Sequence, residues 1–181
     1  MDESVATSDS ADSSAARRSS PASSAADGSR AGDPGAALRV DFYVLGEASA
    51  SARLRLGCKL AEKAYLSAQR TLVWLSDPQE LKAFDELLWT FMDGSFVPHD
   101  VLGSGTAPEE TPVLLSAGIT PQGSFDIIIN LAPGIPGCLS QTGRVAEIVD
   151  GEEARRRAGR ARFKAYRDLG VQPASHNIRA E

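Results

Sequence analysis

Apolar and polar positions follow two different periods between residues 38 and 170, and these periods predict an α/β domain. Compact apolar runs rich in β-branched or aromatic residues indicate strands at 40–45, 71–75, 113–117, 125–131 and 145–149. Apolar residues that recur every three or four positions predict helices at 50–69, 78–92 and 152–169. Stretches rich in Gly, Thr and Pro predict loops at 97–112 and 134–143.

The order of these elements predicts how the sheet is built. Helices separate the first three strands, which favours parallel pairing through right-handed crossovers and a three-layer α/β sandwich. The later strands follow one another closely, and such spacing allows added antiparallel pairs. We therefore expect a mixed, mainly parallel sheet.

The second helix has clear sequence signals at both ends. Asp77 suits the N-cap, Pro78 the first helical position, and Glu80 the third, where it would complete a capping box. Gly94 is placed to end the helix.

The ends of the chain differ in composition from its middle. Residues 1–36 are mainly Ser, Ala, Asp and Gly, which predicts a disordered N-terminal tail because little apolar surface can be buried there. The folded domain is expected at 37–171 and a C-terminal tail without clear pattern at 172–181.

Charge and cysteine content exclude several classes of protein. A net charge of −5 and a pI near 5.1 give no general case for nucleic-acid binding. Cys58 and Cys138 stand alone, which indicates buried, reduced thiols and neither a disulfide nor a zinc site. The sequence shows no apolar run long enough to span a membrane and no secretory signal, so we expect a cytoplasmic location.

Known catalytic and nucleotide-binding motifs are missing from the sequence. The turn after the first strand begins Gly46-Glu47 and has no GxGxxG; GxxxxGK[ST] and GxSxG are also missing, and Gly103-Ser104-Gly105 indicates a turn. His99 and His176 have no obvious triad companions, and the acidic pairs 109–110 and 152–153 suit a solvated surface and a helix N-terminus. We expect no catalytic, cofactor-binding or metal-binding residues.

The helix at 78–92 has more large apolar side chains than one core-facing stripe needs. The stripe itself contains Leu81, Phe84, Leu88, Phe91 and Met92. Trp89 lies roughly 120° from its middle, and Phe96 follows beyond Gly94. These two aromatic residues fit either a small secondary core or the centre of a protein interface.

The last helix is predicted to have two faces. Small residues on one face would let it lie close to the sheet, namely Ala154, Ala158, Ala161, Ala165 and Leu169. The opposite face has Arg156, Arg160, Phe163 and Arg167. It fits a solvated basic surface, or a site for an acidic peptide, a carboxylate terminus or a phosphate backbone.

Four segments together resemble the chi subunit of bacterial DNA polymerase III: FDELLW, SFVPH, DIIINL and RARFKAYRDLG. The resemblance covers about residues 40–170 and implies a Rossmann-like α/β fold without a nucleotide-binding loop. The long N-terminal tail departs from the compact family pattern.

The resemblance also implies a function and its residues. It implies a non-catalytic replication adaptor of the holoenzyme, a DNA-directed DNA polymerase, that uses no cofactor and joins the psi subunit to the acidic tail of single-stranded-DNA-binding protein. Psi, or a repair helicase, would meet Trp89, Phe96, Val97 and Pro98, and the tail would meet Arg156, Arg160, Phe163 and Arg167. One family position in this site is commonly Lys or Tyr, and here it corresponds to Arg156 or Phe163. The positive charge or the aromatic ring is kept, but a tyrosine hydroxyl is not.

The same implication covers the state of the protein. It would be a monomer or a heterodimer with psi, associated with the replisome and nucleoid. It would contact DNA only indirectly and would bind no membrane. Two other functions stay open, namely direct nucleic-acid binding through the basic helix and a degenerate nucleotide-binding enzyme.

Overall fold

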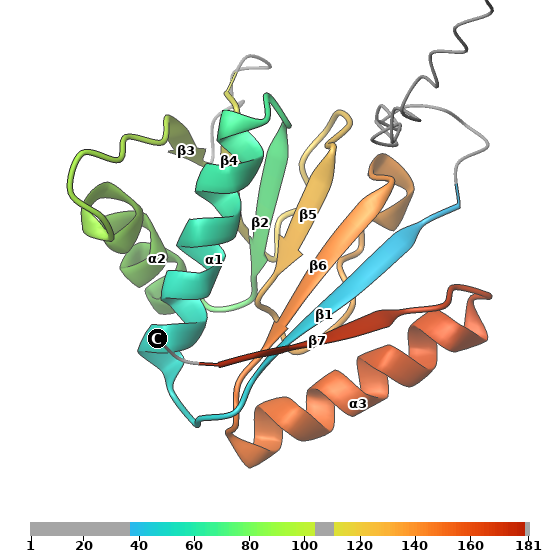
Figure 1. Ribbon diagram of the computed structural model, residues 1–181. Coiled ribbons are helices and arrows are strands. Elements are labelled where there is room, and N and C mark those ends of the chain that lie inside the picture. The colour runs from blue at the N-terminus through green and yellow to red at the C-terminus, as the bar shows by residue number, and fades with distance from the viewer. Residues whose placement is uncertain (1–36, 104–110, 180–181) are drawn as a thin grey trace, which may run out of the picture.

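The computed structural model describes residues 37–103 and 111–179 (Figure 1). The predicted N-terminal tail, Ser104, Gly105 and the Glu109–Glu110 pair lie outside the described residues. The strands are β1 (Arg39–Leu45), β2 (Thr71–Leu75), β3 (His99–Val101), β4 (Val113–Ala117), β5 (Ile127–Asn130), β6 (Arg144–Val149) and β7 (Ala174–Ile178). The helices are α1 (Ala50–Leu66), α2 (Pro78–Thr90), α3 (Glu153–Asp168) and the short 3-10 helix η1 (Leu139–Gln141).

The seven strands form one sheet in the order β3-β4-β2-β5-β6-β1-β7, and every pair is parallel. The predicted α/β fold is confirmed, but the expected antiparallel pairs were wrong. Residues 131–143, which include η1, return the chain to the starting edge of the sheet before β6 begins. A connection of about a dozen residues is long enough for such a crossover, so close spacing along the chain did not force a hairpin.

Both edge strands were missed by sequence reasoning. β3 lies inside the predicted loop at 97–112, and β7 lies inside the predicted C-terminal tail, where it pairs with β1 and places His176 opposite Tyr43. Residues 174–178 are therefore part of the sheet. Their sequences, HDV and ASHNI, are short and polar because an edge strand is only partly covered by neighbours.

The helices cover the sheet on both faces and complete three layers. α1 and α2 pack on one face, and α3 packs on the other (Figure 1). A separate hydrophobic core lies on each face of the sheet. Cys58 is buried in the core beneath α1 and α2 and Cys138 in the core beneath α3, and neither forms a disulfide, as predicted. Burial raises the pKa of the Cys58 thiol to about 12, so this cysteine is neutral and unreactive at physiological pH.

The start of α2 follows the sequence signals only in part. The Asp77 carboxylate accepts a hydrogen bond from the Gln79 amide at 2.9 Å, and Pro78 is the first helical residue. Glu80 does not complete a capping box, because its carboxylate pairs with Arg53 of α1. The core stripe of Leu81, Phe84, Leu88 and Phe91 is buried as predicted. Met92 is exposed because the helix already ends at Thr90, with Gly94 in the following turn at φ +78°.

Candidate functional site

The end of α2 and the turn after it expose three large apolar side chains, which we call the aromatic surface. Trp89 is 52% exposed, Met92 48% and Phe96 61%, and the ring centroids of Trp89 and Phe96 lie 5.4 Å apart. The two rings therefore pack on each other without closing a secondary core. Val97, predicted beside them, is only 2% exposed and belongs to the core, while Pro98 is half-buried.

His99 supports this surface from below. Its side chain is 1% exposed, and its ring centroid lies 4.7 Å from that of Trp89. Nδ1 lies 2.7 Å from the Val97 carbonyl oxygen, and Nε2 lies 3.1 Å from Oδ1 of Asp85. Sequence reasoning found no evident companion for His99 because Asp85 lies on α2, well before it along the chain.

Residues from α3 and β7 line a cavity of about 380 Å³, which we call the α3–β7 groove. Phe163 forms part of its wall and packs on Phe42 at a centroid distance of 5.2 Å. Arg156 and Arg160 line the same groove, together with Val44 and Val149. Arg160 and Phe163 also border a second cavity of about 620 Å³, which Lys164 and Arg167 line. Arg156, Arg160 and Phe163 thus share the α3–β7 groove, and Arg167 lies at the neighbouring cavity.

Two polar residues of the groove were missed by sequence reasoning. Ser175 and Asn177 of β7 line the groove opposite α3. They add small polar groups to a wall that is otherwise apolar or basic. The segment at 172–178 has no apolar alternation that could have predicted them.

The predicted small-residue face of α3 is wrong. Leu169 and Ala161 are exposed, whereas Gly159, Arg162 and Tyr166 are the buried residues of the helix. A Cβ at position 159 would lie 2.9 Å from Cγ2 of Val149, so glycine sets the close approach of helix and sheet.

Arg162 faces the sheet because it has a partner there. It donates from Nε to Glu147 of β6 at 2.8 Å, and Glu147 also accepts from Asn130 at 2.9 Å and from the Tyr166 hydroxyl at 2.7 Å. Burial raises the pKa of Glu147, and the Arg162 charge opposes that rise. This buried network fixes which face of α3 points inward and therefore which residues line the groove.

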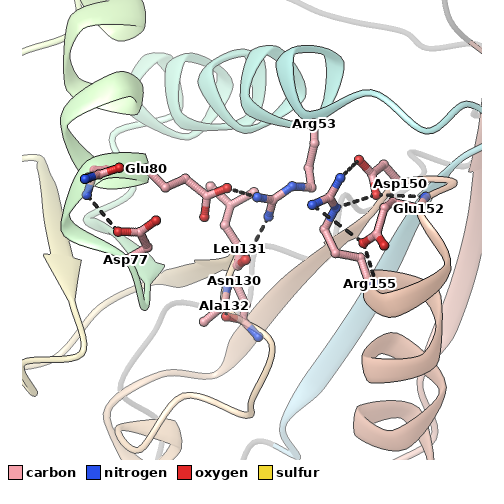
Figure 2. Close-up of polar contacts among 10 residues, drawn as sticks. Arg53, Asp77, Glu80, Asn130, Leu131, Ala132, Asp150, Glu152 and Arg155 are labelled. Atoms are coloured by element: carbon pink, nitrogen blue, oxygen red, sulfur yellow. Dashed lines mark hydrogen bonds and ion pairs between the residues drawn. The ribbon is translucent and has the colours of Figure 1, made fainter.

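Side chains of the chain itself pair with one another at the carboxyl edge of the sheet (Figure 2), where several of them border a cavity of about 300 Å³. Arg53 pairs with Glu80 and donates from Nη1 to the Leu131 carbonyl oxygen at 2.7 Å. Arg155 donates to both carboxylate oxygens of Asp150, at 2.7 and 2.9 Å. Burial alone would raise the pKa of Asp150, but the hydrogen bonds and charge of Arg155 lower it. In open α/β sheets this edge is the usual place for a ligand.

The turn after β1, where a dinucleotide fold would approach a pyrophosphate, is closed by backbone packing. The Gly151 amide donates to the Glu47 carbonyl oxygen, and a Cβ at position 151 would lie 2.6 Å from the Glu47 carbonyl carbon. Among residues 37–103 and 111–179, no group of three or more His, Cys, Asp or Glu side chains could hold a metal ion. No helix within the same ranges is long and apolar enough to cross a bilayer.

Fold and geometry together define a Rossmann-like α/β domain with an aromatic surface beside α2 and a basic groove between α3 and β7. Among solved structures, T4 UvsW resembles it with a TM-score of 0.58 at 10% identity, over 78% of this chain and 42% of that one. The C-terminal domain of the DEAD-box protein Dbp5 gives a TM-score of 0.52 at 9% identity, over 77% of this chain and 91% of that one. These likenesses show the fold alone.

Sequence relatives give the family. A sequence profile of the DNA polymerase III chi subunit, HolC, matches residues 38–174. The DNA polymerase III subunit chi of Pseudomonas aeruginosa is 37% identical over 140 residues, which cover 77% of this chain and 96% of that protein. Its counterpart in Escherichia coli K12 is 28% identical over 120 residues, covering 66% and 82%. The chain belongs to the DNA polymerase III chi subunit family and has a replication accessory role.

Proposed function

We propose that the protein is a non-catalytic adaptor that links the clamp loader, through psi, to the acidic C-terminal tail of single-stranded-DNA-binding protein. The observation that supports this most is the separation of its two exposed surfaces. The aromatic surface belongs to α2 on one face of the sheet, and the α3–β7 groove lies on the other (Figure 1). Two partners could therefore bind at once, as an adaptor in the bacterial cytoplasm requires.

The α3–β7 groove has the chemistry that an acidic tail needs. Arg156 and Arg160 supply guanidinium groups, which grip carboxylates through two parallel hydrogen bonds. Phe42 and Phe163 supply an apolar wall for an aromatic residue near the end of the tail. Arg160 currently pairs with Glu153 at 2.9 Å, and both side chains are largely exposed, so a tail carboxylate can replace Glu153 at little cost.

The aromatic surface has the composition of an interface centre. Tryptophan is among the residues that dominate interface energetics, and methionine adapts its shape to a partner. Trp89, Met92 and Phe96 form one such exposed group in a chain that is acidic overall. We assign this surface to psi, or to a repair helicase that competes for it.

The absence of catalysis is part of the proposal. Its support is the carboxyl edge, the usual ligand position, where Arg53 is paired with Glu80 and Arg155 with Asp150. The cavity that they leave, of about 300 Å³, is at the lower limit of small-molecule pockets. Opening that edge to a nucleotide would break these ion pairs and leave buried charges unpaired.

A fluorescence titration with a labelled acidic peptide ending in Pro-Phe tests the groove. We expect micromolar affinity that weakens as salt is added, because the attraction is largely between charges. Arg160→Ala should weaken binding about tenfold, the usual order for losing one hydrogen bond to a charged group. Arg157→Ala, on the same helix but outside the groove, should bind as the wild type does.

Two outcomes would contradict this assignment. Unchanged affinity in Arg160→Ala would remove that residue from the site. Tighter binding to bare single-stranded DNA of the same length and label would favour a nucleic-acid-binding role of α3 instead.

A further inference from the structure

The cavity at the carboxyl edge of the sheet is lined by three arginines from two helices. Arg53 belongs to α1, Arg155 and Arg162 belong to α3, and all three border the cavity of about 300 Å³. Ligands of open α/β sheets bind at this edge. The cavity shares no lining residue with the α3–β7 groove or with the neighbouring cavity on α3. It is therefore distinct from the surfaces that the proposed adaptor would use.

Arg53 is a buried cation whose hydrogen bonds are incomplete. Its side chain is only 3% exposed. Nη1 donates to the Leu131 carbonyl oxygen at 2.7 Å, and Nη2 pairs with Glu80. Nε is buried and has no hydrogen-bond partner among the described residues. Buried donors are nearly always paired, so this nitrogen, at the border of a cavity, indicates a place for an acceptor.

The guanidinium groups of Arg53 and Arg155 lie close together. Figure 2 shows them next to each other, while Glu80 and Asp150 pair with them from opposite sides. Burial and the positive charges of Arg155 and Arg162 lower the pKa of Arg53 to about 10, although the Asp150 charge opposes this shift. Like charges therefore repel one another at this cavity. An anion placed between them would relieve that repulsion.

The two arginines of α3 also have donors to spare. Arg155 donates from Nε and Nη2 to Asp150, and its Nη1 lies 3.6 Å from the Glu152 carboxylate. That carboxylate accepts hydrogen bonds from the first amides of α3. Arg162 donates from Nε to Glu147 and from Nη1 to a backbone carbonyl oxygen. An arginine has five N–H donors, so donors at this cavity outnumber the acceptors that the chain supplies.

We propose that this cavity binds a tetrahedral oxyanion of the phosphate type, held by Arg53, Arg155 and Arg162. Guanidinium groups match the geometry of phosphate, and an anion with several oxygens can accept from three arginines at once. The volume of about 300 Å³ suits a small anion, whereas a nucleotide would require the ion pairs to open. The phosphate is either free or the terminal group of a monoester. This proposal goes beyond the adaptor role and does not rest on it.

The first experiment titrates inorganic phosphate into ¹⁵N-labelled full-length protein, with chloride keeping the ionic strength constant. The Nε–H signal of Arg53 should shift and saturate, with a dissociation constant on the order of millimolar for a few charged hydrogen bonds. Arg70 is the internal reference, because its Nε is also buried without a partner but lies just before β2, outside this cavity. An unsaturable shift of Arg53, or an equal shift of Arg70, would overturn the proposal.

The same titration with a nucleoside monophosphate identifies the source of the phosphate group. Inorganic phosphate should bind at least as tightly, because the cavity is too small for the nucleoside. Tighter saturation of the Arg53 signal by the monophosphate would support the phosphate site and make a monoester its ligand. If neither compound shifts this signal, no phosphate group binds there.

The second experiment supplies the anion from the chain itself. Ala158 of α3 is half-buried and lines the cavity, so Ala158→Glu places a carboxylate beside the three arginines. We expect at least a tenfold loss of phosphate affinity and a higher Tm, because the new charge takes the place of the ligand. Ala161→Glu, exposed on the same helix outside the cavity, should keep wild-type affinity.

Wild-type phosphate affinity in Ala158→Glu would contradict the proposal. If that variant does not fold, the titration of the unsubstituted protein decides, since it needs no substitution. Neither experiment contains psi or the acidic peptide, so failure of the phosphate site leaves the proposed adaptor role untouched. Failure of the adaptor role likewise leaves the phosphate titration unchanged.

Discussion

Arg162→Ala is expected to lower the free energy of unfolding by about 3–5 kcal/mol, the usual cost of removing one partner of a buried ion pair. The substitution leaves the Glu147 carboxylate at 0% exposure without its counter-charge, held only by Asn130 and Tyr166. It also removes the donor to the Pro133 carbonyl oxygen at 2.8 Å. A loss of this size is a large share of the 5–15 kcal/mol that stabilises a typical domain.

Urea unfolding followed by circular dichroism measures this loss. Arg160→Ala is the matched control, because its side chain is exposed and its ion pair with Glu153 is solvated; we expect a change within about 0.5 kcal/mol. The double variant Arg162→Met with Glu147→Gln removes both charges and should recover part of the loss. A loss below about 1 kcal/mol in Arg162→Ala would show that the network does not fix α3.

Phe96→Ala and Trp89→Ala are each expected to weaken psi binding by about 30-fold or more. Interface hot spots cost about 2 kcal/mol or more when truncated, and about 1.4 kcal/mol corresponds to tenfold. Phe96→Ala should change the free energy of unfolding little, because the Phe96 ring is mostly exposed. Trp89→Ala should lower it somewhat more, because the Trp89 ring also contacts His99.

Calorimetric titration with psi separates the binding loss from any folding defect. Leu169→Ala truncates an apolar side chain that is 64% exposed at the end of α3, on the other face of the sheet, and should leave psi affinity unchanged. Wild-type affinity in both aromatic variants would exclude this surface as the psi site.

The central strands could be predicted because burial determines their sequences. β2 and β4 are compact apolar runs, and their observed bounds are the predicted ones. β3 and β7 could not be predicted, since edge strands are held by backbone pairing with one neighbour and need no apolar pattern.

The inward face of α3 could not be predicted because it depends on a distant partner. The alanines and the true buried residues recur at the same helical period, so the period alone cannot choose between them. The inward face is determined by Glu147 on β6, because its buried carboxylate forms an ion pair with Arg162 of α3. A charged residue in the core contradicts the usual pattern, and only the fold brings its partner near.

The exposed residues of the site were easier to predict than those that hold them. Trp89 and Phe96 lie outside the core stripe, and their exposure follows from helical geometry and the Gly94 turn. Val97 was predicted at the surface together with Phe96 and Pro98, but its side chain is buried in the core, whereas Phe96 is exposed and Pro98 is half-buried. The contact of Asp85 with His99 joins two elements across that turn, and no local pattern predicts it.

Simultaneous capture of both partners tests the adaptor role most directly. The acidic peptide ending in Pro-Phe is immobilised, and psi is applied with or without this protein. Wild-type protein should retain psi on the peptide. The Phe96→Ala variant should bind the peptide but not retain psi. The Arg160→Ala variant should bind the peptide more weakly, so that less of the variant and less psi are retained. The account is contradicted if psi and the peptide displace each other from the wild-type protein, because one surface would then serve both partners.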